Sequence, residues 1–188
     1  MLPLKKPSSY TECKQFYNRG GFFMQKNYER YKAISYSNKW ALARNPLYYD
    51  YSNLGGDCTN FISQCIYAGS GVMNYTPIWG WYYIDANRKA PAWTGVEYLY
   101  NFITRKEKSP GPYGEEVKIS DVEPGDIIQL AFDKIGNFDH SLFIVESGNI
   151  PDINNILINT HSYDRLRYPL NRYHWSRIRF IKILGVRL

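Results

Sequence analysis

Cysteine is scarce in this sequence, and its scarcity excludes one class of small domain. Only Cys13, Cys58 and Cys65 occur in 188 residues, which is too few and too odd a number for a disulfide framework. The chain also contains neither an HExxH segment nor a CxxC pair, so we expect no metal and no organic cofactor. A chain of this length can bury a core large enough for a single domain without such supports.

Long apolar runs are absent as well. No segment approaches the roughly 20 apolar residues that a membrane-spanning helix needs. The first ten residues, MLPLKKPSSY, lack the apolar core of a secretory signal. We therefore expect a soluble chain with no membrane span, which would be cytoplasmic as it stands.

Acidic residues are outnumbered by basic ones. The chain has 23 Lys and Arg against 17 Asp and Glu, for a net charge of +6. Such a surface favours an anionic partner, for example an acidic wall polymer. However, no run of five or six like charges is present, and no groove-reading motif accompanies the charge, so we expect no nucleic-acid partner.

The order of predicted elements indicates an α+β domain. Residues 1–22 are polar and predict a leading arm. Helical spacing of apolar residues follows over 27–45, from Cys58 to about 68, and over 93–108. The second half contains four predicted strands, within 124–132, 140–147, 155–162 and 177–188. Short turn-rich links between these strands favour antiparallel neighbours, and helices followed by an antiparallel sheet are typical of one α+β domain.

Cys58 occupies a position that can activate a thiol. It follows Gly55, Gly56 and Asp57 directly, and Asp57 is a good N-cap residue for a helix that begins there. The free N–H groups of a first helical turn lower a thiol pKa and can hold an oxyanion. Buried packing is the other interpretation of Cys58, and it is the one that we expect for Cys65, two turns further on the apolar face.

A thiol nucleophile needs a base, and the sequence has only three histidines. His140 begins a predicted strand, and His161 lies near the end of the next one. If these strands form a hairpin, the two residues approach each other. Asn159 shares a strand face with His161 and is the alternative third residue, although the expected register favours His161. His174 lies in a polar link, and we expect it at the surface.

Aromatic residues are plentiful, at 17% of the chain. They suit either a groove for a polar ligand or a half-polar core. The candidates for lining a substrate groove are Tyr48, Tyr49, Tyr51, Trp79 and Trp93.

Five segments together resemble the bacterial putative amidase domain family over roughly residues 27–186. They are ERYKAISYSNKWALARNPLYYDYSNLGGDCTNFISQCIYAG, WTGVEYLYNFI, PGDIIQL, DHSLFIV and THSYDRLRYPL. Those domains are similar to NlpC-type and CHAP amidases of the papain-like cysteine peptidase group. The resemblance implies a papain-like fold, and hydrolysis of an amide bond in peptidoglycan or a related cell-wall peptide through a thioester.

In this resemblance Cys58 matches the nucleophile and His140 the base, whereas the third residue varies within the group and stays open between His161 and Asn159. The family members thought to act on walls are usually exported, which implies an extracytoplasmic location that the start of this chain does not support. A non-catalytic module that binds cell wall or a polyanion on the same fold is the alternative, and the intact Cys58 and His140 favour the enzyme.

Overall fold

A computed structural model describes residues 24–188. The predicted arm over residues 1–22, with Cys13, lies outside this range. The helices are α1 (Arg30–Trp40), α2 (Cys58–Ser70), α3 (Pro91–Thr94) and α4 (Val96–Ile103), with 3-10 turns η1 (Ile119–Asp121) and η2 (Leu170–Arg172). The strands are β1 (Gln25–Lys26), β2 (Gly111–Val117), β3 (Ile127–Ala131), β4 (His140–Glu146), β5 (Leu157–Thr160), β6 (Arg165–Pro169) and β7 (Arg177–Arg187).

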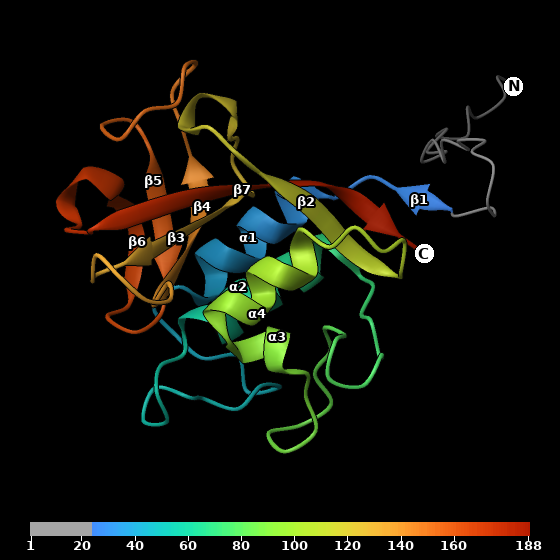
Figure 1. The fold of residues 1–188 in the computed structure, drawn as a ribbon. Coiled ribbons are helices and arrows are strands. Elements are labelled where there is room, and N and C mark those ends of the chain that lie inside the picture. The colour runs from blue at the N-terminus through green and yellow to red at the C-terminus, as the bar shows by residue number, and fades with distance from the viewer. Residues whose placement is uncertain (1–23) are drawn as a thin grey trace, which may run out of the picture.

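The strands form one seven-stranded sheet in the order β1-β7-β3-β4-β5-β6, with β2 paired to β7. All the named pairings are antiparallel. Helices α1, α2 and α4 lie together below the long strand β7 (Figure 1). The predicted α+β class, with helices packed on an antiparallel sheet, is therefore confirmed. None of the helices in the described part of the chain is long and apolar enough to cross a membrane.

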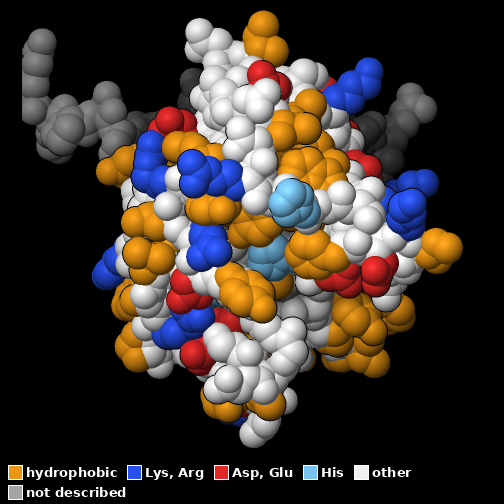
Figure 2. Space-filling model, turned by 90° about the vertical axis from the view of Figure 1, so that its left-hand side faces the viewer, with side chains coloured by type: hydrophobic (Ala, Val, Ile, Leu, Met, Phe, Trp, Pro, Cys, Tyr) orange, Lys and Arg blue, Asp and Glu red, His pale blue; other side chains and the backbone are white. Residues whose placement is uncertain are grey.

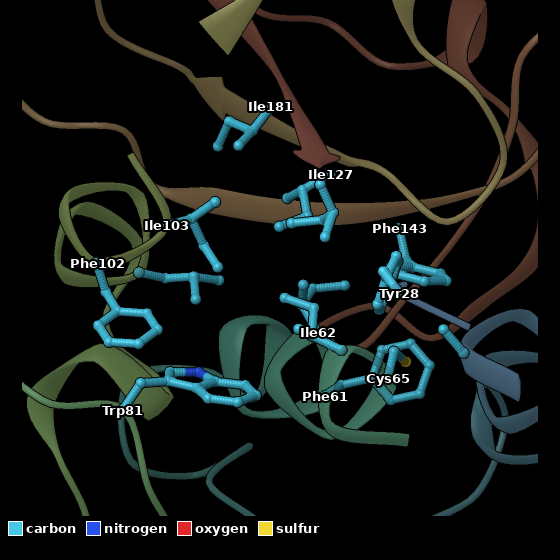
Figure 3. Packing of buried hydrophobic residues seen from close by; sticks show 14 of the residues in the cluster. Tyr28, Phe61, Ile62, Cys65, Trp81, Phe102, Ile103, Ile127, Phe143 and Ile181 are labelled. Carbon is cyan, nitrogen blue, oxygen red and sulfur yellow. The ribbon is translucent and has the colours of Figure 1, made fainter. Parts of the chain in front are cut away.

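Alternation along the strands gives the sheet an apolar layer on each face. Ile127 and Phe143 belong to the cluster that packs against the helices, and Figure 3 shows them facing Phe61 and Ile62 of α2. Their neighbours along the strands belong to a second cluster: Ile128, Leu130, Leu142, Ile144. Cys65 is fully buried in the first cluster, so its expected core position is confirmed.

Helix α2 begins where the sequence predicts and runs slightly past the predicted end near residue 68, to Ser70. Cys58 is its first residue, and Gly71 follows its last residue with a left-handed φ of 60°. Glycine adopts this conformation at a helix C-terminus without the steric cost of a Cβ. Almost every residue of α2 is buried, so the helix lies inside the molecule, and its N-terminus is held in one place by packing on several sides.

The other two helix predictions are too long. The predicted 27–45 helix ends at Trp40, and two of the apolar residues in the predicted range, Tyr31 and Leu42, are 83% and 61% exposed. The predicted 93–108 helix is broken at Gly95, whose backbone is extended with φ −105° and ψ 129°. A Cβ at Gly95 would lie only 2.8 Å from the Tyr98 ring, so a larger residue would clash at this position.

Three of the seven strands in residues 24–188 escape prediction. Strand β1 has only two residues, and the composition of β2 and β6 argues against strands. Strand β2 has the sequence GPYGEEV and pairs only with β7. Strand β6 has the sequence RLRYP and pairs only with β5. Both lie at the margins of the sheet, where proline, glycine and charge are tolerated because one side of the strand needs no partner.

Candidate active site

Cys58 lies at the point where α2 meets the start of β4. Its side chain is buried, and its sulfur is 3.7 Å from the Thr59 hydroxyl oxygen. The Thr59 hydroxyl is in turn 3.0 Å from the hydroxyl of Ser141, the second residue of β4. The backbone N–H of Ser141 also faces the Cys58 sulfur. The first turn of α2 is therefore held against β4 at Ser141, the residue that follows His140.

The electrostatic environment of Cys58 differs from the one expected at a helix start. Burial raises the pKa of the Cys58 thiol above its ordinary value of 9.0, while the Ser141 N–H and the Thr59 hydroxyl act in the opposite direction. Desolvation disfavours the thiolate because a charge loses its water shell. The expectation of a lowered thiol pKa is therefore wrong for the free protein, in which Cys58 rests as a neutral thiol.

His140 is the first residue of β4, as predicted, and its ring is buried. The Phe132 and Tyr173 rings lie 6.2 and 6.0 Å away, centroid to centroid. Burial lowers the pKa of His140 to about 4, and the neighbouring Asp139 charge opposes this shift. At neutral pH the imidazole is thus uncharged and has a lone pair that can accept a proton.

The side chain that approaches His140 is Thr160. Its hydroxyl oxygen lies 3.5 Å from His140 Nε2 and 2.9 Å from each of the carbonyl oxygens of Ser141 and His161, which are the nearer acceptors for its single proton. Because the hydroxyl proton points to a carbonyl oxygen, the Thr160 oxygen can only accept a hydrogen bond from His140. This arrangement favours the tautomer with a proton on Nε2 and leaves Nδ1 as the basic nitrogen.

The expected contact of His140 with His161 or Asn159 is wrong. The His161 ring nitrogens are bound elsewhere, Nδ1 at 2.6 Å from Asp57 Oδ2 and Nε2 at 2.9 Å from the Trp40 carbonyl. The Asn159 amide donates to Ser37 and Asn38, both at 2.9 Å, and its oxygen accepts from the Arg167 N–H.

The prediction failed because it placed Asn159 and His161 on the wrong face of β5 relative to His140. Asn159 pairs with Phe143, which lies an odd number of residues from His140. Cross-strand partners share a face and side chains alternate, so Asn159 and His161 point away from the face of His140. Thr160 shares that face.

Asp57 occupies the N-cap position but does not cap α2 with its side chain. Its buried carboxylate accepts from the Tyr51 N–H at 3.0 Å, from the Asn60 amide at 2.8 Å and from His161. The expected capping role of the carboxylate is therefore wrong, and Asp57 instead ties the loop before α2 to the end of β5. Gly56 makes this possible, because at φ 112° its Cα lies so near that a Cβ would be 3.0 Å from the Ser162 hydroxyl.

The predicted aromatic groove is not assembled. Trp93 is fully buried, donates to Asn60 Oδ1 at 2.9 Å and stacks on Tyr48, so Trp93 is a core residue. Tyr51 is also buried, and Tyr49 is half exposed against it. Trp79 is 77% exposed at a separate cavity of about 450 Å³. None of the residues that line this cavity belongs to the group around Cys58.

The prediction for His174 has a simpler outcome. His174 is exposed, as expected. Within residues 24–188 there is no group of three or more His, Cys, Asp or Glu side chains that could hold a metal ion.

Sequence reasoning missed three residues of the site, Thr160, Ser141 and Tyr173. The pairing of β4 with β5 identifies Thr160, and Ser141 follows His140 directly in the sequence. Tyr173 lies in the link between β6 and β7 and carries no sequence signal that separates it from the other tyrosines.

These features define an α+β protein with a buried thiol at the start of a helix and a buried imidazole at the start of the strand that contacts this helix. The chain belongs to the putative amidase domain family, whose profile matches residues 27–184. It is 31% identical to the uncharacterized protein YhbB of Bacillus subtilis over 164 residues, which are 85% of this chain and 49% of YhbB. It is 30% identical to the uncharacterized protein YjcM of the same organism, over 77% of this chain and 33% of YjcM.

The chain therefore spans half or less of the length of these relatives. No solved structure matches it. Family membership suggests hydrolysis of an amide bond.

Proposed function

We propose that this domain is a cysteine-dependent amidase in which Cys58 is the nucleophile and His140 the general base. The observation that carries the proposal is the fastening of the Cys58 turn to the start of β4 through Thr59 and Ser141. A nucleophile and its base must be held within reach of each other before either can act. The proposal includes a papain-like arrangement of a helix-borne thiol and a strand-borne imidazole.

The chemistry follows from the protonation states. The sulfur of Cys58 adds to the carbonyl carbon of the amide while its proton passes to Nδ1 of His140. The tetrahedral intermediate collapses when the imidazolium returns that proton to the leaving amine, which breaks the C–N bond and leaves a thioester. Water then attacks the thioester with His140 again taking a proton, and the carboxylic acid and the free thiol are released.

Thr160 supports this cycle as a positioning residue. Its oxygen accepts from Nε2 of His140 and so keeps Nδ1 free of a proton in the resting state. When the imidazolium forms, the same oxygen remains a partner for Nε2–H. This is the part that a third residue plays in a triad, although an uncharged hydroxyl stabilises the imidazolium less than a carboxylate does.

The substrate class that we propose is a peptide amide of peptidoglycan or a related cell-wall peptide. The net charge of +6 suits an anionic polymer. Figure 2 shows Lys and Arg side chains to either side of the histidines on one face of the molecule. Attraction between this face and an anionic wall would raise the local substrate concentration and would weaken with added salt.

The proposal is tested by hydrolysis of isolated peptidoglycan, followed as newly released amino groups. Cys58→Ala should reduce the rate by at least ~10³-fold, the scale of removing a triad member. Cys65→Ala is the matched control, because Cys65 is a second buried thiol on the same helix, and this variant should lose stability rather than turnover. Equal rates for wild type and Cys58→Ala would contradict the proposal, and wall binding without any hydrolysis by the wild type would favour the non-catalytic binding module.

A further inference from the structure

The hydroxyl of Tyr173 is an exception among the buried tyrosines. Its oxygen is shielded from solvent and has no hydrogen-bond partner within residues 24–188. By contrast, the buried Tyr28 and Tyr51 hydroxyls donate to the carbonyls of Gly125 and Ala86, at 3.3 and 3.2 Å. A buried hydroxyl without a partner is costly, so its presence calls for an explanation.

Tyr173 lies against His140, and its hydroxyl is within electrostatic range of Cys58. Its ring centroid is 6.0 Å from that of His140, with an angle of 37° between the planes. Its hydroxyl is near enough to Cys58 that a negative charge on the sulfur would raise the pKa of Tyr173. Tyr168 packs edge-on against the Tyr173 ring at 5.6 Å and 86°. The ring orientation is therefore set by packing, and the hydroxyl is held at the site.

The Tyr173 hydroxyl is a donor at neutral pH. Burial raises its pKa to about 12, against the effect of the Arg165 charge. A protonated hydroxyl beside a nucleophile, with no acceptor of its own in the resting protein, can make its hydrogen bond when an acceptor forms there.

We propose that the Tyr173 hydroxyl donates a hydrogen bond to the oxyanion formed when Cys58 attacks the amide carbonyl. The inference rests on the proposed function and assigns a second catalytic group to the same site. As the C–S bond forms, the carbonyl π electrons move onto oxygen, and the Tyr173 O–H pairs with that charge without transferring its proton. The bond is absent in the free protein and strongest in the transition state, which is the condition for lowering the barrier.

The first turn of α2, which carries Cys58, also supplies backbone N–H groups. These groups have no partner within their helix because they precede its first full turn. Tyr173 and the start of α2 would thus hold the oxyanion together, with one donor from the link between β6 and β7 and the others from the helix that carries the nucleophile.

Tyr173→Phe is the test, with turnover of an N-acetylalanine p-nitrophenyl ester as the probe. The variant should lower kcat by about 10²-fold, the range for removing one oxyanion donor, with KM within about twofold of wild type. Its thermal unfolding temperature should stay the same or rise, because the change removes a buried hydroxyl that has no partner. Tyr168→Phe is the matched control, the same atom removed from the adjacent ring, and it should leave kcat unchanged.

Three results would overturn the inference. An unchanged kcat in Tyr173→Phe would remove the catalytic role, and a raised KM at unchanged kcat would make Tyr173 a substrate anchor. A lowered unfolding temperature at unchanged kcat would make it structural. The Cys58→Ala variant, measured in the same assay, distinguishes a failure of this inference from a failure of the proposed function. If Cys58→Ala is inactive and Tyr173→Phe is fully active, only the role assigned to Tyr173 is lost.

Discussion

At the scale of single residues, burial decides how the thiol and the imidazole are poised. It raises the pKa of Cys58 and lowers that of His140 to about 4. Both shifts favour the uncharged forms, because neither group retains its water shell. The pair should therefore rest as a thiol and a neutral imidazole, with the proton transferred only as the substrate carbonyl is attacked.

This resting state predicts the pH dependence of alkylation by iodoacetamide in the absence of substrate. Only the thiolate reacts, and the pKa of Cys58 lies above 9.0. The rate should therefore be low at neutral pH and rise with a midpoint above that value. His140→Gln should leave the midpoint in place, since the imidazole is already neutral throughout that range. The experiment is best done with Cys13→Ala and Cys65→Ala combined, so that Cys58 is the thiol observed.

A different pH profile of alkylation would contradict a resting state of neutral thiol and neutral imidazole. If alkylation already reached its plateau at about pH 6 and His140→Gln shifted the midpoint upward, the free protein would hold a thiolate–imidazolium pair, as a low-pKa catalytic cysteine does.

At the scale of elements, a buried polar network joins the loop before α2 to the end of β5. Asp57 lies at its centre, with His161 at 2.6 Å and the Arg44 guanidinium at 3.4 Å. Both ring nitrogens of His161 face acceptors, the Asp57 carboxylate and the Trp40 carbonyl. These contacts join the His161 ring to the loop before α2 and to the end of α1.

The network predicts that His161 and Thr160, adjacent in sequence, respond differently to substitution. His161→Ala should lower the free energy of unfolding by about 3–5 kcal/mol, because it leaves the buried Asp57 carboxylate without its closest partner. Thr160→Val should cost only about 1 kcal/mol but should lower kcat about tenfold, since it removes the acceptor that orients His140. Urea unfolding and kcat of both variants are the measurements.

The opposite pattern would contradict this assignment. A stable His161→Ala protein with a greatly reduced kcat, beside a fully active Thr160→Val protein, would restore His161 as the orienting residue.

At the scale of the whole molecule, the sequence predicts the α+β architecture because its strongest signals are local. Four apolar strands and the cysteine-bearing helix lie where periodicity and turn residues place them. The marginal strands β2 and β6 could not be predicted, since their stability comes from pairing with β7 and β5 rather than from their own composition. Tertiary context overrides propensity at such positions.

The residues of the candidate site can also be predicted only in part. Cys58 and His140 could be selected from their places at an element boundary, which is a property of the local sequence. Thr160, by contrast, depends on the pairing of Phe143 with Asn159, and an error of one residue in register exchanges the faces of a strand. Trp93 and Tyr51 are buried rather than part of a groove, a difference that aromatic composition alone does not predict.

The central claim, that Cys58 forms a thioester during turnover, is tested most directly by pre-steady-state hydrolysis of an N-acetylalanine p-nitrophenyl ester. The account predicts a burst of about one p-nitrophenolate per protein before the steady rate, the kinetic sign of an acyl-enzyme. Acid-quenched protein should carry the acyl mass on the peptide that contains Cys58. Cys65→Ala should show the same burst, and Cys58→Ala should show none. An acyl group found elsewhere, or a burst that survives in Cys58→Ala, would contradict the account.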